Sequence, residues 1–431
     1  MKKINTSLVE KILVILSILF IAVLWLSKSY WSNVVAAMVL IIDFYMVFKV
    51  IKNTLIFFLF MTIAYFDYSV IFSKYFFRIE NFDWIFKLIK YNDTLFVGIA
   101  IVFILHSIIL FFMKKEIYTD KKQIFEMTSE EKKFNNKYCK LIMSFLIAII
   151  AFVVFDYFFF HIIFNKETIY EYLLIPIIIV IYYCRDNKLF RRMILLIIVF
   201  SAAINIYRGG RIASLCPLIA YFFIIYYKKI NYKIVSFVMI VGILFYVFFG
   251  MYGDILIHNG DVTKLSVFDL SDRISEDMLT LDTSYSAYWT GLTMVESRNI
   301  VKPVERIKNM IHFFSTYTIF GTLSNYEQVS NITHNYYTHW YGGYITGYFY
   351  YWLGIIGVIL ISLYLSYLLY KFASVNTNSS NYIKILLVYF ICTVPRWYLY
   401  YPTGLFRGVL IYTVVYYVIN VILQKKIKIR W

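Results

Sequence analysis

Long apolar runs recur along most of this chain, and they constrain its fold more than any other feature. Most of them hold about 18 or more residues, enough for a helix to cross the ~30 Å hydrocarbon core of a bilayer. A segment in lipid must satisfy its own backbone hydrogen bonds, and the strands of a membrane barrel would alternate apolar and polar residues. These runs are continuous, so they predict an all-α, polytopic membrane protein. Only 16% of the residues are charged, against about 25% in soluble domains.

The runs predict about twelve transmembrane helices, and one long polar insert interrupts them. The first run follows a short basic N-terminus and lacks a small-residue cleavage site, so it is interpreted as a retained helix. The expected domains are an N-terminal bundle of about nine helices (1–249), a large exterior loop (250–340) and about three C-terminal helices (341–431). The predicted spans are Ile12–Leu26, Trp31–Phe48, Thr54–Phe72, Thr94–Met113, Leu141–Ile163, Tyr170–Cys184, Met193–Tyr207, Ile212–Tyr227, Ile234–Phe249, Tyr341–Tyr370, Tyr382–Val394 (or on to Tyr401) and Leu405–Leu423.

Lysine and arginine set the expected orientation of the spans. With the N-terminus inside, the connectors rich in lysine face the cytoplasm, and the connector 114–140 alone carries eight lysines. The insert holds ten acidic residues against six basic ones, which suits a translocated segment. Both termini are then cytoplasmic. These basic helix ends explain much of the net charge of +17, so no nucleic-acid partner is expected.

Arginine is distributed differently from lysine on this topology. The inner side holds 22 lysines and 4 arginines, whereas the outer side holds 8 of each. Arginine binds phosphate and carboxylate through two parallel hydrogen bonds, so an anionic ligand is expected outside. The sharpest motif is Arg208-Gly209-Gly210-Arg211, between two spans at the outer surface. Its glycines permit a tight reversal, and its arginines are predicted to clamp a phosphate or pyrophosphate. The alternative is a helical hairpin with two arginines that anchor it at the interface.

The insert ends in a second candidate site, the stretch from Thr333 to Trp340. Loops as long as the insert are uncommon unless they are functional or disordered, and its tryptophans and tyrosines argue against disorder. His334 is predicted to act as a general base or hydrogen-bond donor, and Asn335 and His339 are predicted to bind substrate. The spacing of the two histidines suits no shared metal face, so no metal is expected. Trp340 has an alternative role in an interfacial aromatic belt.

Three further arginines are candidates for contact with the ligand. Arg396 and Arg407 flank the last exterior hairpin, and Arg407 stands at the start of a span, where a charge is costly unless it is partnered or near water. Their alternative role is to extend along the helix towards water. Arg298 lies among the acidic residues of the insert, and its alternative role is an ordinary surface ion pair.

Ionisable residues inside the predicted spans form a separate group of candidates. Asp43, Asp67, Asp156 and His106 are expensive to bury in a bilayer, so each is a functional candidate by default. A proton-coupled transporter would need such residues. The four cysteines show no metal-type spacing and no convincing disulfide pair.

With these features, the chain resembles the Wzy-type O-antigen and capsular polysaccharide polymerases. The likeness covers the whole length as architecture, and its local carriers are the Arg208–Arg211 motif and the His334-Asn335 pair that precedes the glycine-rich run from Tyr341. It is also similar to the related O-antigen ligases, which have a His-Asn element after a large loop. The resemblance implies a GT-C-like fold in the bacterial inner membrane, with the insert in the periplasm.

The resemblance also implies the reaction. A growing glycan is transferred from undecaprenyl pyrophosphate to the sugar of another lipid-linked repeat unit, without a metal or other cofactor and with a chain-length regulator as a protein partner. Arg208 and Arg211 are expected to grip the pyrophosphate with help from Arg396 or Arg407, while His334 assists the acceptor hydroxyl or holds the phosphate. The alternatives are a flippase for the same lipid-linked oligosaccharide, an O-antigen ligase and a glycan acyltransferase.

Overall fold

Apart from a few isolated positions, the computed structural model describes residues 6–73, 91–113, 122–126, 173–207, 211–244, 283–321, 324–337 and 342–428. Every secondary-structure element among these residues is a helix, which confirms the all-α prediction. The chain divides into two compact units. Unit 1 comprises residues 1–120, 267–374 and 394–403, and unit 2 comprises residues 121–266, 375–393 and 404–431.

Six helices are long and apolar enough to cross a membrane, which is consistent with a multi-pass membrane protein. Each overlaps a predicted span, and four shorter apolar helices overlap others. The predicted span Leu141–Ile163 lies almost entirely outside the described residues. The six candidates are Leu8–Leu26, Ser32–Lys49, Thr54–Ile71, Asn92–Phe112, Ile355–Ala373 and Thr403–Val421, and the shorter helices are Leu174–Cys184, Ser214–Ile225, Tyr232–Leu244 and Asn381–Cys392.

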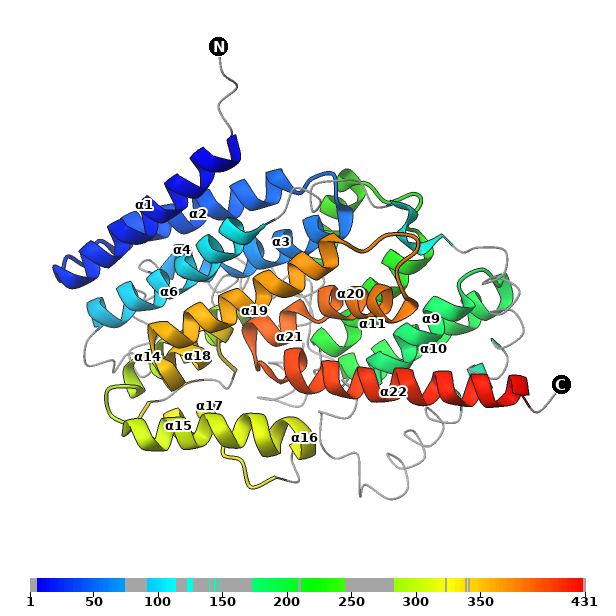
Figure 1. The fold of residues 1–431 in the computed structure, drawn as a ribbon. Helices are drawn as coiled ribbons and strands as arrows, with labels where there is room; N and C mark the ends of the chain where they lie inside the picture. The colour runs from blue at the N-terminus through cyan, green and yellow to red at the C-terminus, as the bar shows by residue number, and fades with distance from the viewer. Residues whose placement is uncertain are drawn as a thin grey trace, which may run out of the picture. The chain divides into compact units, whose positions relative to one another are not determined.

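Helix α6 (Tyr91–Phe112) forms the centre of unit 1. It contacts α1 (Thr6–Leu26), α2 (Ser32–Lys49) and α19 (Ile355–Ala373), and Figure 1 shows these helices running beside one another. In the apolar window of α6, 83% of the residues are buried, against 17% in that of α1. An apolar helix that is buried throughout belongs to the core, whereas α1 exposes apolar side chains at the edge of the unit.

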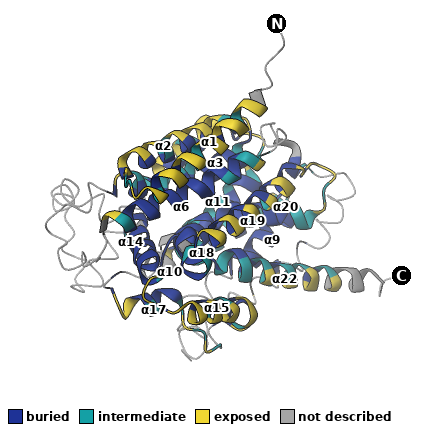
Figure 2. Cartoon of the chain, turned by 60° about the vertical axis from the view of Figure 1, so that its left-hand side comes forward, coloured by how far each residue is buried: buried dark blue, intermediate teal, exposed yellow. Residues whose placement is uncertain are grey.

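Helix α14 (Thr283–Ser297) is a buried helix of unit 1, although its residues were expected to lie in a loop (Figure 2). It packs against α6 and α18 (Ile345–Leu353). A Cβ on Gly347 would lie 3.1 Å from the Cα of Gly291, so the two helices approach closely. Thr290 donates its hydroxyl to the carbonyl of Ser286. Small residues and self-satisfied hydroxyls allow a sequence of modest hydropathy to pack inside a helix bundle.

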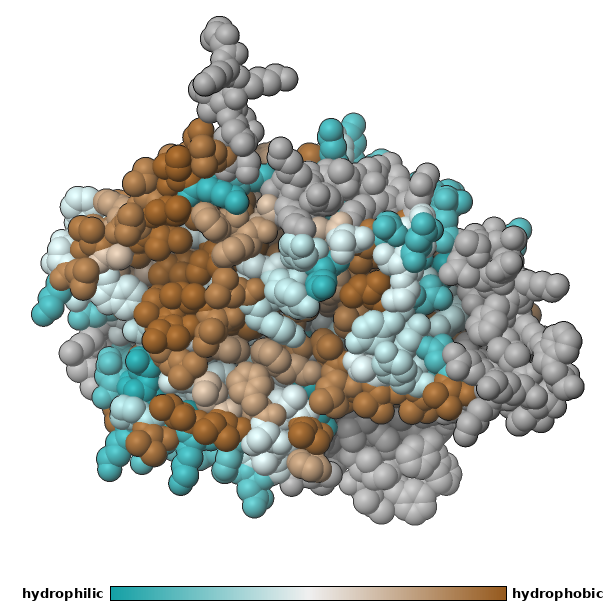
Figure 3. Space-filling view, in the orientation of Figure 1, coloured by the Kyte–Doolittle hydropathy of each residue, from teal (hydrophilic) through white to brown (hydrophobic). Residues whose placement is uncertain are grey.

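Three further helical segments complete the described part of the insert: α15 (Pro303–His312) with η6 (Phe313–Tyr317), α16 (Thr318–Phe320) and α17 (Val329–His334). Phe313 packs against Trp352 of α18, with ring centroids 5.0 Å apart. One side of α15 exposes apolar residues. They form a brown strip above the hydrophilic side chains of this helix in Figure 3. They are Val304, Ile307 and Ile311.

Two of the predicted spans are each broken into two helices. The run Tyr341–Tyr370 forms α18 and α19, which are separated at Gly354, where φ is +68°. Since side chains other than glycine rarely adopt this conformation, Gly354 ends α18. The run Tyr382–Val394, with its extension to Tyr401, forms α20 (Asn381–Cys392) and the separate α21 (Val394–Leu399). The first break lies inside a run long enough to hold a turn before the span proper, and the second separates the optional extension to Tyr401 from the span Tyr382–Val394.

Unit 2 is built around α9 (Leu174–Cys184), in which every residue is buried. This helix packs against α10 (Lys188–Tyr207), α11 (Arg211–Ile225) and α20. Tyrosine hydroxyls tie the helices together, because buried hydroxyls need partners. Tyr182 donates to Asn381 Oδ1 at 2.6 Å, and Tyr412 of α22 (Thr403–Lys428) donates to the carbonyl of Tyr382 at 2.7 Å.

Unit 2 also contains a disulfide between Cys139 and Cys184, whose Cα atoms are 5.4 Å apart. The expectation that the cysteines form no disulfide pair is therefore wrong. The two residues are 45 positions apart along the chain, and no spacing rule connects them.

Candidate functional site

The Arg208–Arg211 motif joins α10 to α11, as expected. Helix α10 ends at Tyr207 and α11 begins at Arg211, and the Ser214 hydroxyl donates across the hairpin to the carbonyl of Ala202, 3.2 Å away. Arg208 and the side chain of Arg211 lie outside what the structure describes. The phosphate clamp therefore stays a prediction. Arg211 does stand at a helix N-terminus, where the helix dipole favours an anion.

In unit 1, the end of the insert and the residues directly after it pack against residues 396–401, which form the second half of α21 and the turn that follows it. The backbone N–H of Gly343 donates to the carbonyl of Leu399 at 3.0 Å. Gly342 has φ of +114°, and a Cβ there would lie 3.3 Å from the ring of Tyr400. The hydroxyls of Ser330 and Tyr401 are 3.5 Å apart. Residues 330–343 and 396–401, which both carry predicted site residues, are therefore in contact.

The two histidines of the insert lie together within this contact region. His334 is exposed at the end of α17, whereas His339 is 5% exposed. Their rings meet edge to face with centroids 5.1 Å apart, and His339 Nε2 lies 2.9 Å from Thr333 Oγ1. Asn335 is exposed and caps α17. This arrangement holds one histidine in the protein and presents the other to the surface.

The aromatic residues of the insert differ in what they can reach. Trp289 is 1% exposed and packs in the core of unit 1, so it cannot stack on a sugar. Tyr336 is 49% exposed and lies two residues after His334. An exposed aromatic ring next to polar groups is suited to stacking against a carbohydrate ring.

Arg396 and Arg407 belong to different units. Arg396 is half-buried in the last turn of α21, and its guanidinium lies over the ring of Tyr400, 5.4 Å from the centroid. Arg407 is half-buried near the start of α22. Of the two, Arg396 shares a unit with the histidines, and it lies in the segment that contacts the end of the insert.

Arg298 and Arg306 hold the end of α18. Arg298 donates to the carbonyls of Tyr350 and Tyr351 at 3.4 and 3.5 Å, and the buried Arg306 donates to that of Tyr351 at 3.0 Å. The last carbonyls of a helix carry its negative dipole end, which cations stabilise. Burial and the neighbouring Arg298 lower the pKa of Arg306. Substrate contact by Arg298 stays a prediction.

Gly354 is required beside this arginine cap. A Cβ at Gly354 would lie 2.7 Å from Arg298 Nη2, and the left-handed backbone adds strain. We expect Gly354→Ala to destabilise the protein by about 1–3 kcal/mol, measured as a lower midpoint of thermal unfolding in detergent. Gly242→Ala is the matched control, because a Cβ there meets nothing within 4 Å and alanine favours a helix. Equal effects of the two changes would contradict the proposed role of Gly354.

Glu296 is a buried acid of α14 that was not among the predicted site residues. Thr94 of α6 donates to Glu296 Oε2 at 3.2 Å, which ties the insert to the central helix. Burial and the neighbouring Glu296 raise the pKa of Tyr337. Glu296 could have been predicted as a buried acid only if α14 had been expected to lie in the core.

Three of the intramembrane candidates meet in unit 1. His106 Nδ1 lies 2.8 Å from Asp43 Oδ1, and His106 Nε2 lies 3.4 Å from Asp67 Oδ2. Tyr398 of α21 donates to Asp67 Oδ1 at 2.7 Å, and its hydroxyl is 3.2 Å from His106 Nε2. All four side chains are buried. We call these four residues the buried cluster; Tyr398 was not predicted, and Asp156 lies outside the described residues.

The imidazole bridges the two carboxylates of the buried cluster. Potential ligand atoms of Asp43, Asp67 and His106 lie within 4.8 Å of one another. However, Nδ1 faces Asp43 and Nε2 faces Asp67. A metal ion bound to one ring nitrogen would therefore lie beside only one of the two carboxylates. Each ring nitrogen therefore pairs with a different carboxylate, and Nε2 also lies within hydrogen-bond distance of the Tyr398 hydroxyl.

The buried cluster is connected to the contact region through two tyrosines. The rings of Tyr344 and Tyr398 have centroids 5.2 Å apart. Tyr344 donates to the carbonyl of Phe66 at 2.6 Å, and its hydroxyl lies 2.9 Å from that of Ser69. Tyr344 follows Gly343 directly and Tyr398 precedes Leu399, so the same backbone pairing positions both sites.

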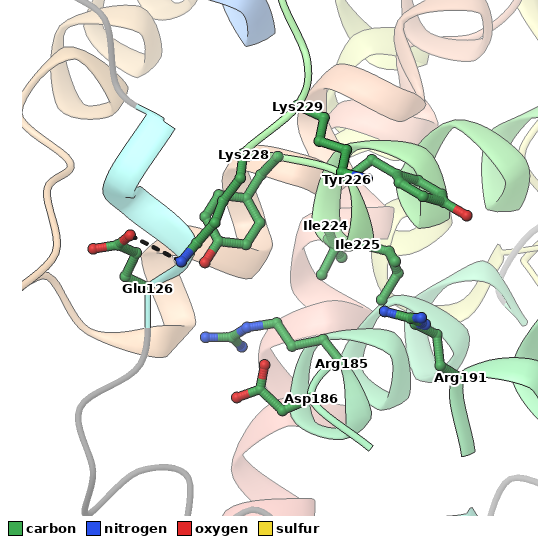
Figure 4. Close-up of a pocket in the computed structure, with 10 residues that line it drawn as sticks. Glu126, Arg185, Asp186, Arg191, Ile224, Ile225, Tyr226, Lys228 and Lys229 are labelled. Atoms are coloured by element: carbon green, nitrogen blue, oxygen red, sulfur yellow. Dashed lines mark ion pairs between the residues drawn. The ribbon is translucent and has the colours of Figure 1, made fainter. Parts of the chain in front are cut away.

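A cavity of about 500 Å³ lies in unit 2 and is rich in basic side chains (Figure 4). Arg185 already donates to the carbonyls of Tyr182 and Phe125, at 2.6 and 2.9 Å, and Lys228 pairs with Glu126 at 3.2 Å. These strong donors are therefore engaged within the protein, and none of the predicted site residues lines the cavity.

No protein-family model matches the sequence, and no curated protein or solved structure shows significant similarity to it.

Proposed function

We propose that the chain is a polysaccharide polymerase that joins lipid-linked oligosaccharide repeat units on the outer face of the membrane. The observation that carries the proposal is the contact in unit 1 between residues 330–343 and 396–401. This contact brings the segments of His334, His339 and Arg396 together, although they are widely separated along the chain. A histidine and an arginine at one surface suit the transfer of a sugar from an anionic leaving group.

The proposed architecture is GT-C-like, with about twelve spans and both termini in the cytoplasm of a bacterium. In it, the insert lies on the periplasmic side of the inner membrane. The apolar helices support this proposal because an undecaprenyl-linked donor is itself held in the bilayer. A chain-length regulator is the proposed protein partner.

Helix α15 is proposed to rest on the bilayer surface. Its exposed residues Val304, Ile307 and Ile311 recur at helical spacing on one side, while the exposed Glu305 lies off that side. A helix with an exposed apolar stripe and a polar opposite face is typical of the membrane interface. This position would place α17, which follows α15 in the insert, near the headgroups where the donor pyrophosphate lies.

In the proposed reaction, an acceptor hydroxyl attacks the anomeric carbon of the donor sugar. The bond from that carbon to the pyrophosphate oxygen breaks, and undecaprenyl pyrophosphate leaves with the bonding electrons. Arg208 and Arg211 bind the leaving anion with help from Arg396 or Arg407, and His334 takes the hydroxyl proton or holds the phosphate. Fixed arginines aimed at the developing negative charge lower the barrier electrostatically.

The test uses the full-length protein in proteoliposomes, supplied with lipid-linked repeat units extracted from a strain that lacks this gene. We expect a ladder of lengthened glycans and release of undecaprenyl pyrophosphate, without nucleotide sugar and unchanged by EDTA. Movement of the lipid-linked units across the bilayer without lengthening would identify a flippase. Transfer to lipid A–core alone would identify a ligase, and transfer of an acyl group would identify an acyltransferase.

A further inference from the structure

The buried cluster of Asp43, Asp67, His106 and Tyr398 has no part in the proposed glycosyl transfer. Its four side chains come from α2, the end of α3 (Thr54–Phe66), α6 and α21. Asp43, Asp67 and His106 are 3%, 0% and 1% exposed. Ionisable groups held this deep in a helix bundle are costly unless their charges are balanced. The protonation state of the cluster therefore decides how costly its burial is.

The described groups of the buried cluster do not balance one another. With both carboxylates ionised and the imidazole neutral, the net charge of the cluster is −2. With the imidazole protonated, the net charge is −1. The ion pairs of Asp43 and Asp67 in the described chain are both with His106. The Tyr398 hydroxyl, which donates to Asp67 Oδ1, is neutral, and the nearby hydroxyls of Tyr344 and Ser69 bond to each other and to the carbonyl of Phe66. One further positive charge is needed to make the site neutral.

The hydrogen-bond directions show where that charge can be placed. With imidazolium at His106, Nδ1 forms an ion pair with Asp43 Oδ1 at 2.8 Å and Nε2–H can donate to the Tyr398 oxygen at 3.2 Å. Tyr398 in turn donates to Asp67 Oδ1 at 2.7 Å. Of the two carboxylates, Asp67 has the longer contact with the imidazole, 3.4 Å from Oδ2 to Nε2 against 2.8 Å for Asp43, and its Oδ2 accepts no hydrogen bond. A proton on this oxygen leaves every other hydrogen bond intact.

We propose that the buried cluster is a proton-binding site, in which Asp67 takes up one proton from water and releases it again. Uptake forms an O–H bond on Oδ2 and changes the net charge of the cluster from −1 to zero. Release restores the carboxylate, which keeps the Tyr398 hydroxyl as its donor. The same heavy-atom contacts therefore serve both states. This site is independent of the polymerase proposal, since it uses none of the groups assigned to glycosyl transfer.

The site also links protonation to the outer contact region. Tyr398 is two residues from Arg396, and both lie on α21. Tyr398 is also the described hydroxyl donor to Asp67. A change of charge on Asp67 therefore acts on the short helix that carries Arg396. A buried ionisable group that biases the position of a packed element is a recognised way to couple two sites.

The test is pH-difference infrared spectroscopy of the full-length protein in lipid nanodiscs. We expect the carbonyl band of a protonated, buried carboxylic acid to grow on acidification and to be lost in Asp67→Asn. Glu305→Gln is the matched control, because Glu305 is an exposed acid of α15. The band of the buried carboxylic acid should be the same in this variant as in the wild type. Tyr398→Phe keeps Asp67 but removes its hydroxyl donor, so the band should persist at a higher frequency.

Either of two results would overturn the proposal. The first is a band that survives unchanged in Asp67→Asn, or no such band in the wild type. The second is a stoichiometric divalent metal in protein purified without chelator, absent from His106→Ala, which would replace the proton by a metal ion. If Asp67→Asn does not fold, an unshifted band in Tyr398→Phe serves as the contradicting result. Polymerase activity is measured separately, so failure of one proposal leaves the other intact.

Discussion

Replacing Arg208 and Arg211 together by alanine is expected to lower the rate of polymer formation by about 10²–10³-fold or more. The two guanidiniums are proposed to bind the leaving pyrophosphate, and removing preorganised donors to a developing charge raises the barrier for the reaction rather than weakening substrate binding alone. The measurement is the initial rate of glycan lengthening in proteoliposomes, at equal amounts of folded protein.

Two further variants separate the proposed clamp from a general effect of charge. Lysine at both positions keeps the charge but loses the parallel pair of hydrogen bonds, so it should restore only part of the rate. Arg192→Ala removes an exposed arginine from the other end of the same helix, α10, and should leave the rate unchanged. Full activity of the double alanine variant would show that the motif is a helical hairpin with arginines that anchor it at the membrane interface.

His334→Ala is expected to lower the rate of polymer formation by about 10²–10⁴-fold if the residue acts as a general base. The side chain is exposed at the end of α17, and its neighbour His339 is fixed against Thr333. The pH dependence of the rate should change with it: the acidic limb of the wild-type profile should be absent from the variant.

His312→Ala is the control for this change, because His312 is also an exposed histidine at the end of a helix, α15. It should leave both the rate and its pH profile unaltered. A His334→Ala protein with a reduced rate but an unchanged acidic limb would assign phosphate binding, rather than proton transfer, to His334. An unchanged rate would remove His334 from the site.

The sequence predicts the long apolar helices well because continuous hydropathy leaves a segment in lipid few alternatives to a helix. It predicts their ends poorly where glycine intervenes. The run Tyr341–Tyr370 contains no charged residue, and the break at Gly354 depends on a positive φ and on the guanidinium of Arg298 packed beside it. Neither property is visible in a hydropathy profile.

The burial of α14 shows why the insert was not recognised as part of the helical core. Serine, threonine, tyrosine and glycine lower its hydropathy, yet Thr290 and Thr293 donate to carbonyls of their own helix. Gly291 meets Gly347 at a close crossing. Polar residues are tolerated in a helix interface when they are small and their hydrogen bonds are satisfied locally.

The candidate sites were predictable in part. Residue chemistry identified Asp43, Asp67 and His106 one by one, because charge in a span is costly wherever it lies. That they meet, and that Tyr398 joins them, depends on the packing of α21 against α3, which no local pattern encodes. Arg298 was selected for its charge, whereas the structure uses that charge to hold the carbonyls at the end of α18.

The most direct measurement of polymerisation is the banding pattern of surface polysaccharide on a gel, taken from a strain in which this gene is deleted. We expect the long-chain ladder to disappear and lipid A–core bearing a single repeat unit to remain, because export and attachment would work while chain growth fails. The ladder should return with the wild-type gene and not with the Arg208→Ala, Arg211→Ala variant. A ladder of normal length in the deletion strain would contradict the polymerase assignment.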